Sequence, residues 1–252
     1  MASEDAIFEA KNISKSFGPV RVLEEVNIRL YPGQVVGLVG NNGAGKSTLI
    51  KILTGYHAQD NGELLMEGQP IRFSSPADAR RRGIETVYQD LGLINHLPIY
   101  RNVFLKREIL TRILGIPFLN DREMRRQTVE YLQQIKVNVP DVNTEVAWLS
   151  GGQRQAIAVA RSIFSDPKVL ILDEPLAAMG AREGRMILDL VVDLKKTKNT
   201  AILLIAHNYA QVFEVCDRVN WLSHGRVVFD KAVGETSVDE LTELVMSDYR
   251  AG

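Results

Sequence analysis

Apolar residues in the first third of the chain alternate with polar ones, which predicts short strands joined by turns. In 26–30 every second residue is apolar, and a Tyr-Pro-Gly-Gln turn separates this segment from 35–39, which is almost entirely apolar. A run that is apolar at odd and even positions alike is typical of a central strand covered on both faces. Edge strands are predicted at 63–66 and 71–73, and a short helix at 46–53.

The middle of the chain, 91–146, is rich in helix-forming residues, and its most periodic segment, 122–135, predicts a helix with charges on one face. Strands and helices alternate again after residue 149, and the last helix is introduced by a capping-box pattern at Ser237 and Glu240. The strands predicted in this part are 169–172, 201–206, 219–222 and 227–229. The alternation predicts an α/β fold with a mainly parallel sheet, interrupted by a helical insertion.

Composition and charge limit the possible classes of protein. The 252 residues are 45% hydrophobic and 24% charged, with a net charge of −1 and a single cysteine, Cys216. These proportions exclude a disordered chain, a collagen-like repeat and a disulfide scaffold. No apolar run approaches the roughly 20 residues that cross a bilayer, and Glu4 and Asp5 stand where a signal peptide needs basic residues, so we expect a soluble, non-secreted protein. Because the protein as a whole carries almost no net charge, any polyanion must be bound by a local group of residues rather than attracted by the overall field.

A glycine-rich loop follows the buried strand at 35–39. Residues 40–47, Gly-Asn-Asn-Gly-Ala-Gly-Lys-Ser, match the phosphate-binding pattern GxxxxGK[ST] between a strand and a helix, the context that the pattern requires. Its N–H groups and the helix N-terminus favour phosphate oxygens, Lys46 is expected to reach the β- and γ-phosphates, and Ser47 to bind Mg²⁺. The residues expected to contact the nucleotide here are Gly40, Asn41, Asn42, Gly43, Ala44, Gly45, Lys46, Ser47 and Thr48.

Two carboxylates end the apolar strand at 169–172. In an α/β sheet, ligands bind at the carboxyl ends of the strands. We therefore expect Asp173 to hold Mg²⁺ and Glu174 to orient and deprotonate an attacking water. Acidic residues also commonly cap the following helix, so this pair indicates nucleotide hydrolysis only in combination with the loop at 40–47.

A third motif identifies a family. Residues 149–155, Leu-Ser-Gly-Gly-Gln-Arg-Gln, offer small residues and a helix N-terminus to an anion, or simply cap a helix. The segment resembles the signature of ATP-binding cassette (ABC) ATPases, and the three motifs, in this order, extend the resemblance over essentially the whole chain. It implies a P-loop α/β core with an antiparallel N-terminal β region and a helical subdomain. Two copies would face each other head to tail. The residues that would then contact ATP bound to the other copy are Ser150, Gly151, Gly152 and Gln153.

The resemblance implies roles for three more residues. Gln89 is similar to the glutamine that touches Mg²⁺ and the attacking water at the start of the helical insertion. His207 is similar to the histidine that contacts the γ-phosphate and supports Glu174. Phe17 occupies the place of the aromatic ring that stacks on adenine. The catalytic set implied in this way is Glu174, His207, Lys46 and Gln89, with Ser47, Gln89 and Asp173 at the metal.

The resemblance also implies an organisation and partners. A single ATP-binding domain would fill 1–252, with a core at 1–90 and 160–252 and a helical subdomain at about 91–159. The expected partners are a second copy, membrane-spanning permease subunits and, through them, a solute-binding protein outside the cell, but no nucleic acid. The chain would act peripherally at the cytoplasmic face of the membrane.

One position departs from the family pattern. Gly180 stands where most members have an aspartate that contacts the other copy. A glycine here, together with the motif at 88–91, resembles single-cassette carbohydrate importers, so a sugar is the expected cargo. An exporter ATPase and a soluble ABC protein that does not transport remain alternatives. Residues 91–105 and the apolar 113–119 would either face a partner or form the core of the insertion.

Overall fold

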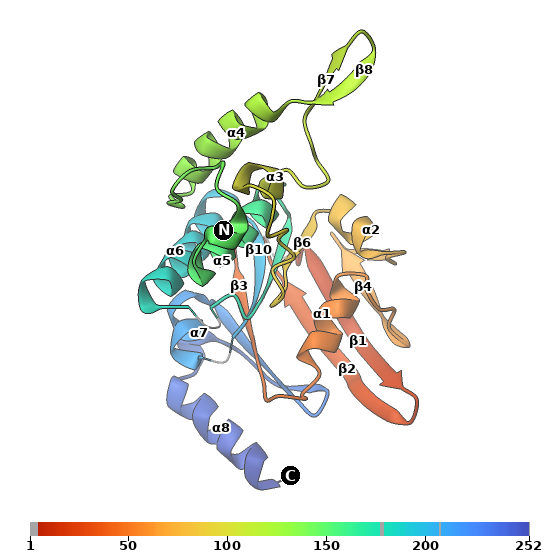
Figure 1. Ribbon diagram of the computed structural model, residues 1–252. Helices are drawn as coiled ribbons and strands as arrows, with labels where there is room; N and C mark the ends of the chain where they lie inside the picture. Colours follow the sequence, from red (N-terminus) through yellow and green to blue (C-terminus); the bar gives the residue numbers. More distant parts are fainter. Residues whose placement is uncertain (1–4, 177–178, 207, 252) are drawn as a thin grey trace.

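A sheet of six strands forms the centre of the protein. The computed structural model describes residues 5–176, 179–206 and 208–251. The strand order is β12-β11-β3-β10-β9-β6, and within the described residues all neighbours are parallel except β11 and β12 (Figure 1). The strands are β3 (Val35–Val39), β6 (Ile84–Val87), β9 (Val169–Asp173), β10 (Ala201–Ile205), β11 (Arg218–Ser223) and β12 (Arg226–Ala232). The predicted mainly parallel sheet is confirmed.

A second, antiparallel sheet is built from the N-terminal part of the chain. Its order is β2-β1-β4-β5, and Phe8 of β1 pairs with Leu30 on one side and Met66 on the other. The strands are β1 (Phe8–Phe17), β2 (Val20–Leu30), β4 (Asn61–Met66) and β5 (Gln69–Ile71). The antiparallel N-terminal β region is therefore confirmed.

Several helices begin directly after a residue whose side chain caps them. The side chains of Ser75, Asn120 and Ser150 each accept a hydrogen bond from a backbone N–H in the first turn of the helix that follows, and Ser237 accepts one from Glu240 N at 3.1 Å. The helices are α1 (Lys46–Leu53), α2 (Pro76–Arg81), α3 (Ile99–Val103), α4 (Asp121–Gln134), α5 (Gly151–Ile163), α6 (Ala181–Thr197), α7 (Tyr209–Val215) and α8 (Val238–Ala251). None of the described helices is long and apolar enough to span a bilayer.

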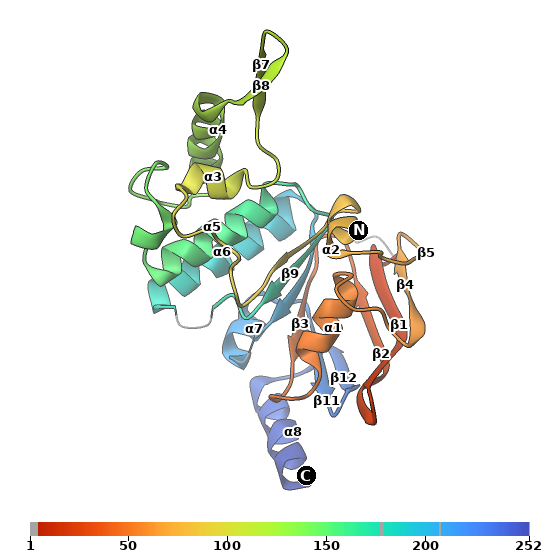
Figure 2. The ribbon, with the colours of Figure 1, turned by 45° about the vertical axis from the view of Figure 1, so that its right-hand side comes forward.

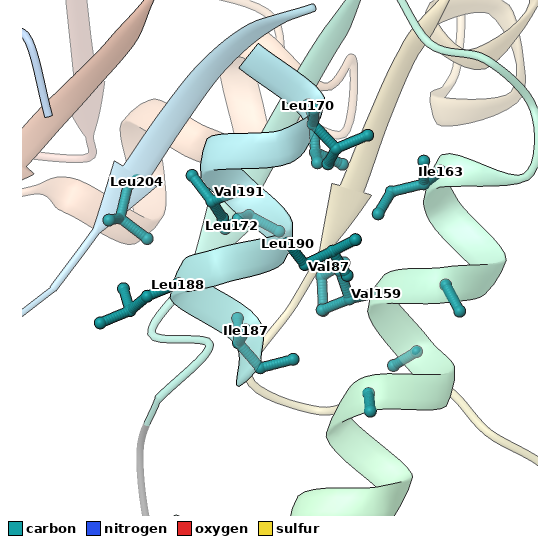
Figure 3. Packing of buried hydrophobic residues seen from close by; sticks show 14 of the residues in the cluster. Val87, Val159, Ile163, Leu170, Leu172, Ile187, Leu188, Leu190, Val191 and Leu204 are labelled. Atoms are coloured by element: carbon teal, nitrogen blue, oxygen red, sulfur yellow. The ribbon is translucent and has the colours of Figure 1, made fainter. Parts of the chain in front are cut away.

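Each central strand contributes to two hydrophobic cores. In β9, Val169 and Ile171 pack with the antiparallel sheet and α1, whereas Leu170 and Leu172 face the helices on the other side. Figure 3 shows Leu170 and Leu172 beside the helices that carry Val159 and Val191. This two-sided burial explains why β3 and β10 carry no polar side chain, since side chains alternate between the faces of a sheet.

The insertion after β6 is helical in α3 and α4 but also contains a β-hairpin that the helix-forming composition did not predict. Strands β7 (Leu110–Ile113) and β8 (Ile116–Leu119) pair with each other and with no further strand in the described part of the chain. Leu114 and Gly115 form the turn with φ values of 52° and 84°, the positive pair that a tight two-residue hairpin needs. The apolar segment 113–119 is therefore exposed rather than part of the core of the insertion.

The segment 91–105 belongs largely to the core. Ile99 and Tyr100 are buried, and Leu91 and Leu93 pack against the same cluster. Ile94 is 42% exposed, so it is the apolar residue of this segment that most clearly faces outward.

Candidate functional site

The phosphate-binding loop connects the central strand β3 to α1. A Cβ atom at Gly40 would overlap the carbonyl oxygen of Leu222 on β11, so only glycine lets the chain leave the sheet at this point. Gly43 and Gly45 have φ values of 83° and 107°, a conformation that other residues rarely adopt. Gly45 is also the N-cap of α1, and it supplies no capping side chain to the first-turn N–H groups. These N–H groups and the helix dipole together suit an anion.

A cleft of ≈ 540 Å³ lies over this loop. Its size falls within the range of about 300–1,000 Å³ that is usual for small-molecule sites. Besides the loop, it is lined by Val22, Gln89 and Glu174, which come from three other parts of the chain. The loop residues in its lining are Asn41, Asn42, Gly43, Ala44, Gly45, Lys46, Ser47 and Thr48. The fold thus brings most of the predicted site residues together, and it adds Val22, which no sequence motif indicated.

Lys46 is buried at the base of the cleft, with 8% of its surface exposed. Its Nζ donates hydrogen bonds to the carbonyl oxygens of Gly40 at 2.6 Å and Asn41 at 3.0 Å. Burial lowers the pKa of Lys46, and the nearby carboxylates of Glu174 and Asp173 partly oppose this shift. The cation is therefore held at the loop next to the two acidic residues that end β9.

Asp173 and Glu174 leave the sheet beside Lys46. The N–H of Glu174 donates to the carbonyl oxygen of Ile205 at 3.1 Å, and its φ of 51° turns the chain sharply at the end of β9. Both side chains are partly buried, and that of Glu174 lines the cleft. A carboxylate next to a phosphate-binding loop is correctly located to orient a water molecule.

The residues around the cleft suit Mg²⁺. Ser47, Gln89 and Asp173 offer only oxygen ligands, which Mg²⁺ prefers. In the part of the chain that the structure describes, no three His, Cys, Asp or Glu side chains are grouped as a metal site.

Gln89 follows β6 and is exposed at the cleft. Its neighbour Tyr88 donates a hydrogen bond to Thr54 Oγ1 at 3.0 Å, and Thr54 donates in turn to the carbonyl oxygen of Ile50 at 2.8 Å. The position of Gln89 is therefore tied to the C-terminal end of α1, the same helix that begins at Lys46.

Three residues predicted for the site, Phe17, Gly40 and Asp173, do not line the cleft. Phe17, at the end of β1, is 46% exposed, and its ring meets His57 edge-on with centroids 5.5 Å apart. It does not belong to the cleft lining, so its role at adenine stays a prediction. His207 lies outside the described residues.

The signature residues lie at the N-terminus of α5, and none of them lines the cleft of the same chain. Ser150 and Gln153 form a capping box: Gln153 N donates to Ser150 Oγ at 3.2 Å, and Ser150 N donates to Gln153 Oε1 at 3.0 Å. The helix-cap interpretation of this motif is thus confirmed for these two residues. Gly151 is exposed, and a Cβ there would meet no atom within 4 Å.

Glu183, in the first turn of α6, is a contact that the sequence did not reveal. A Cβ atom at Gly152 would lie 2.7 Å from the Cβ of Glu183, and one at Gly180 would lie 2.6 Å from its Oε2. Glu183 therefore lies between the signature helix and the glycine that replaces the usual aspartate. A glycine within a helix is a weak signal of such close packing.

Comparisons with known proteins agree with the three motifs. Residues 23–177 match the protein family described as ABC transporter. The xylose/arabinose import ATP-binding protein XylG of Sulfolobus acidocaldarius is 47% identical, with the alignment covering 98% of this chain and 96% of the relative. The ribose import ATP-binding protein RbsA of Rhodopirellula baltica is 37% identical over 98% of this chain, which spans 47% of that relative.

A solved structure of an ATP-binding cassette of an ABC transporter has a TM-score of 0.84 with this chain at 25% identity, covering 97% of this chain and 99% of the other. This chain therefore shares its overall fold with that ATP-binding cassette. The chain belongs to the ABC transporter family and is one of its ATP-hydrolysing subunits.

Proposed function

We propose that this chain drives the import of a sugar and works as a head-to-tail pair with a second copy at the cytoplasmic face of the membrane. One observation carries the ATPase part of the proposal: Lys46, Gln89 and Glu174 come from separate segments and line one nucleotide-sized cleft. The similarity to sugar import ATP-binding proteins supports a sugar as the cargo. Loop 40–47 and α1 would hold the ATP phosphates through backbone N–H groups. Lys46 would then donate its hydrogen bonds to phosphate oxygens instead of to the loop carbonyl oxygens that it contacts here.

Hydrolysis would depend on positioning and on electrostatics. Glu174 would accept a proton from the water that attacks the γ-phosphate, and Gln89 would help to orient that water. Ser47, Gln89 and Asp173 would hold Mg²⁺, which neutralises charge on the phosphates when bound. His207 would contact the γ-phosphate, and Phe17 would stack on adenine.

The position of the signature residues supports a shared site. Ser150, Gly151, Gly152 and Gln153 do not line their own cleft, yet Ser150 and Gly151 are exposed. In a head-to-tail pair they would close the cleft of the other copy, so that ATP binding favours pairing and hydrolysis favours separation. In this arrangement the core would comprise 1–90 and 160–252, and the helical subdomain about 91–159.

A second cleft, of ≈ 260 Å³, supports a place for the permease. It lies between α2 and the start of the insertion, with Asp90, Leu91 and Gly92 on one side and Lys106 and Arg107 near α3. Because Gln89 is next to these residues, a permease segment seated here would be linked to the ATP site. The permease would in turn receive sugar from a solute-binding protein.

Uptake of labelled sugars tests the proposal. Cells that lack the gene should lose uptake of one or more of xylose, arabinose, ribose and fructose, and the wild-type gene should restore it while Glu174→Gln does not. Glu243→Gln, on the exposed face of α8, is the matched control and should restore uptake. Unchanged uptake of every sugar in the deletion strain would disprove the sugar assignment.

A further inference from the structure

The β7–β8 hairpin stands apart from the rest of the protein. Figures 1 and 2 show it projecting beyond α4, and its two strands pair with each other and with no other described strand. Its base is fixed by Asn120, whose N–H donates to the Ile109 carbonyl oxygen at 2.7 Å and whose side chain donates to Thr111 Oγ1 at 2.8 Å. Beyond this base, every residue from 110 to 119 is exposed.

The hairpin is apolar on both faces. Leu110 pairs with Leu119, which places these two side chains on one face, and Ile113 and Phe118 lie on the opposite face. The exposed fractions are 57% for Leu110, 56% for Ile113, 98% for Leu114, 58% for Ile116, 49% for Phe118 and 48% for Leu119. A groove on a partner protein would cover one face of the hairpin and leave the other in water, whereas the apolar part of a bilayer would surround both faces.

The tip residue is an unfavourable choice for its backbone conformation. Leu114 has a φ of 52°, where Asn, Asp or Gly is preferred and a leucine side chain is strained. A two-stranded hairpin of this kind is also marginally stable in water. A large apolar side chain held in this conformation at full exposure indicates that it is buried in a functional state.

Positive charge surrounds the base of the hairpin. Segment 101–126 holds seven Lys and Arg residues and three acidic ones, a net charge of +4 in a chain whose total is −1. Asp121 and Glu123 are paired with Arg101 and Arg126. The exposed Lys106, Arg112 and Arg122 make no ion pair among the described residues, so their charge is available to an anionic partner.

We propose that the hairpin inserts its tip into the interface of an anionic bilayer, with Lys106, Arg112 and Arg122 among the lipid headgroups. A strand of four residues is about 13 Å long, which takes Leu114 past the headgroups while the base stays in water. Lys106 also lines the cleft assigned above to the permease, so the hairpin rises from the side of the protein that faces the membrane. This orientation rests on the proposed function. The outcome of the vesicle experiment does not depend on it.

The test uses the purified full chain and vesicles without permease. The chain should float with vesicles of equal parts phosphatidylglycerol and phosphatidylcholine and should bind vesicles of pure phosphatidylcholine far less, because each basic residue at an anionic surface changes binding about fivefold. Leu114→Ser should weaken binding about tenfold by removing a buried apolar side chain. Arg112→Glu should weaken it in low salt and have less effect in high salt.

Val228→Ser is the matched control. Val228 is 57% exposed on β12, outside the insertion, and its replacement should leave vesicle binding unchanged. All variants should keep the ATP hydrolysis of the wild type, since none of these residues lines the nucleotide cleft.

A fluorescent label attached at Leu114→Cys gives a second readout. The native Cys216 is buried, which raises the pKa of its thiol and keeps it unreactive, so the label reports the tip alone. Its emission should shift to the blue with the anionic vesicles. The proposal is overturned by absence of binding to the anionic vesicles, by equal binding to both vesicle types, or by undiminished binding of Leu114→Ser.

Discussion

The side chain of Glu183 on α6 fills the space beside Gly152 on α5, so that a Cβ at Gly152 would lie 2.7 Å from the Cβ of Glu183. Helix α5, which begins with the signature motif, and helix α6, which follows the carboxylates at the end of β9, are therefore in direct contact. At Gly180 the same carboxylate occupies space that a larger residue would need. Gly180, which stands in place of the usual aspartate, therefore lies against the Glu183 side chain of the same chain.

We expect Gly152→Ala to destabilise the fold by about 1–3 kcal/mol, because the added methyl group overpacks a contact made by the inner part of the Glu183 side chain. Glu183→Gly removes the Cβ and Cγ atoms that the added methyl group would meet, so the double variant should be more stable than the sum of the two single changes predicts. Thermal unfolding of the four proteins measures this coupling. Gly151→Ala is the control, since its Cβ meets nothing within 4 Å. Additive changes would contradict the contact.

Glu174→Gln should lower the rate of ATP hydrolysis by about 10²–10⁴-fold, the usual contribution of a general base. ATP should still bind, because loop 40–47 is unchanged, and the ATP-bound pair should accumulate. Phosphate release and gel filtration with ATP measure the two effects. Glu243→Gln should behave like the wild type. Normal hydrolysis by Glu174→Gln would show that another group accepts the proton.

Two inactive variants should restore activity when mixed. Lys46→Ala damages the cleft and Ser150→Arg damages the signature, so in a head-to-tail pair one composite site combines the intact parts. Each variant alone, at the same total concentration, should hydrolyse almost no ATP. Ser150→Arg also removes a helix cap worth about 1 kcal/mol, so its thermal unfolding must first confirm that it is folded. A mixture as inactive as its components would argue against sites shared between copies.

Acid should weaken α4. The hydrogen bond from Arg126, followed by that from Gln127, lowers the pKa of Glu123 from 4.5 to about 2. A carboxylate with a lowered pKa stabilises the folded state above its ordinary pKa, and this stabilisation is lost as the pH falls from about 4.5 towards 2. The unfolding temperature should therefore fall across this window, and less steeply in Glu123→Gln than in Glu243→Gln. Equal slopes would contradict the assignment.

Several elements were predictable because local sequence specifies them. Helix α1 begins after the glycine loop and ends before Gly55, at the predicted bounds 46–53. The predicted capping box at Ser237 and Glu240 marks a true helix start, since Glu240 N donates to Ser237 Oγ. Such signals depend on neighbours within a few residues, so they can be recognised without knowledge of the fold.

The hairpin was not predictable from the same kind of signal. Apolar residues in a segment rich in helix formers suggest either a buried core or a partner surface, and periodicity cannot distinguish them. Their exposure depends on how far the insertion extends from the rest of the protein, which is a property of the whole fold. The contact between Glu183 and Gly152 was hidden for the same reason, since the two residues lie on different helices.

The sequence by itself determined the type of chemistry. The spacing of residues 40–47, the carboxylates at 173–174 and the motif at 149–155 indicate a phosphate-binding ATPase, because backbone geometry and ligand chemistry allow few other residues at those positions. Only the tertiary structure decided which of these residues meet. It placed Gln89 and Glu174 at the cleft of Lys46 and left Ser150 away from it, because the order of strands in the sheet, not the order along the chain, sets these distances.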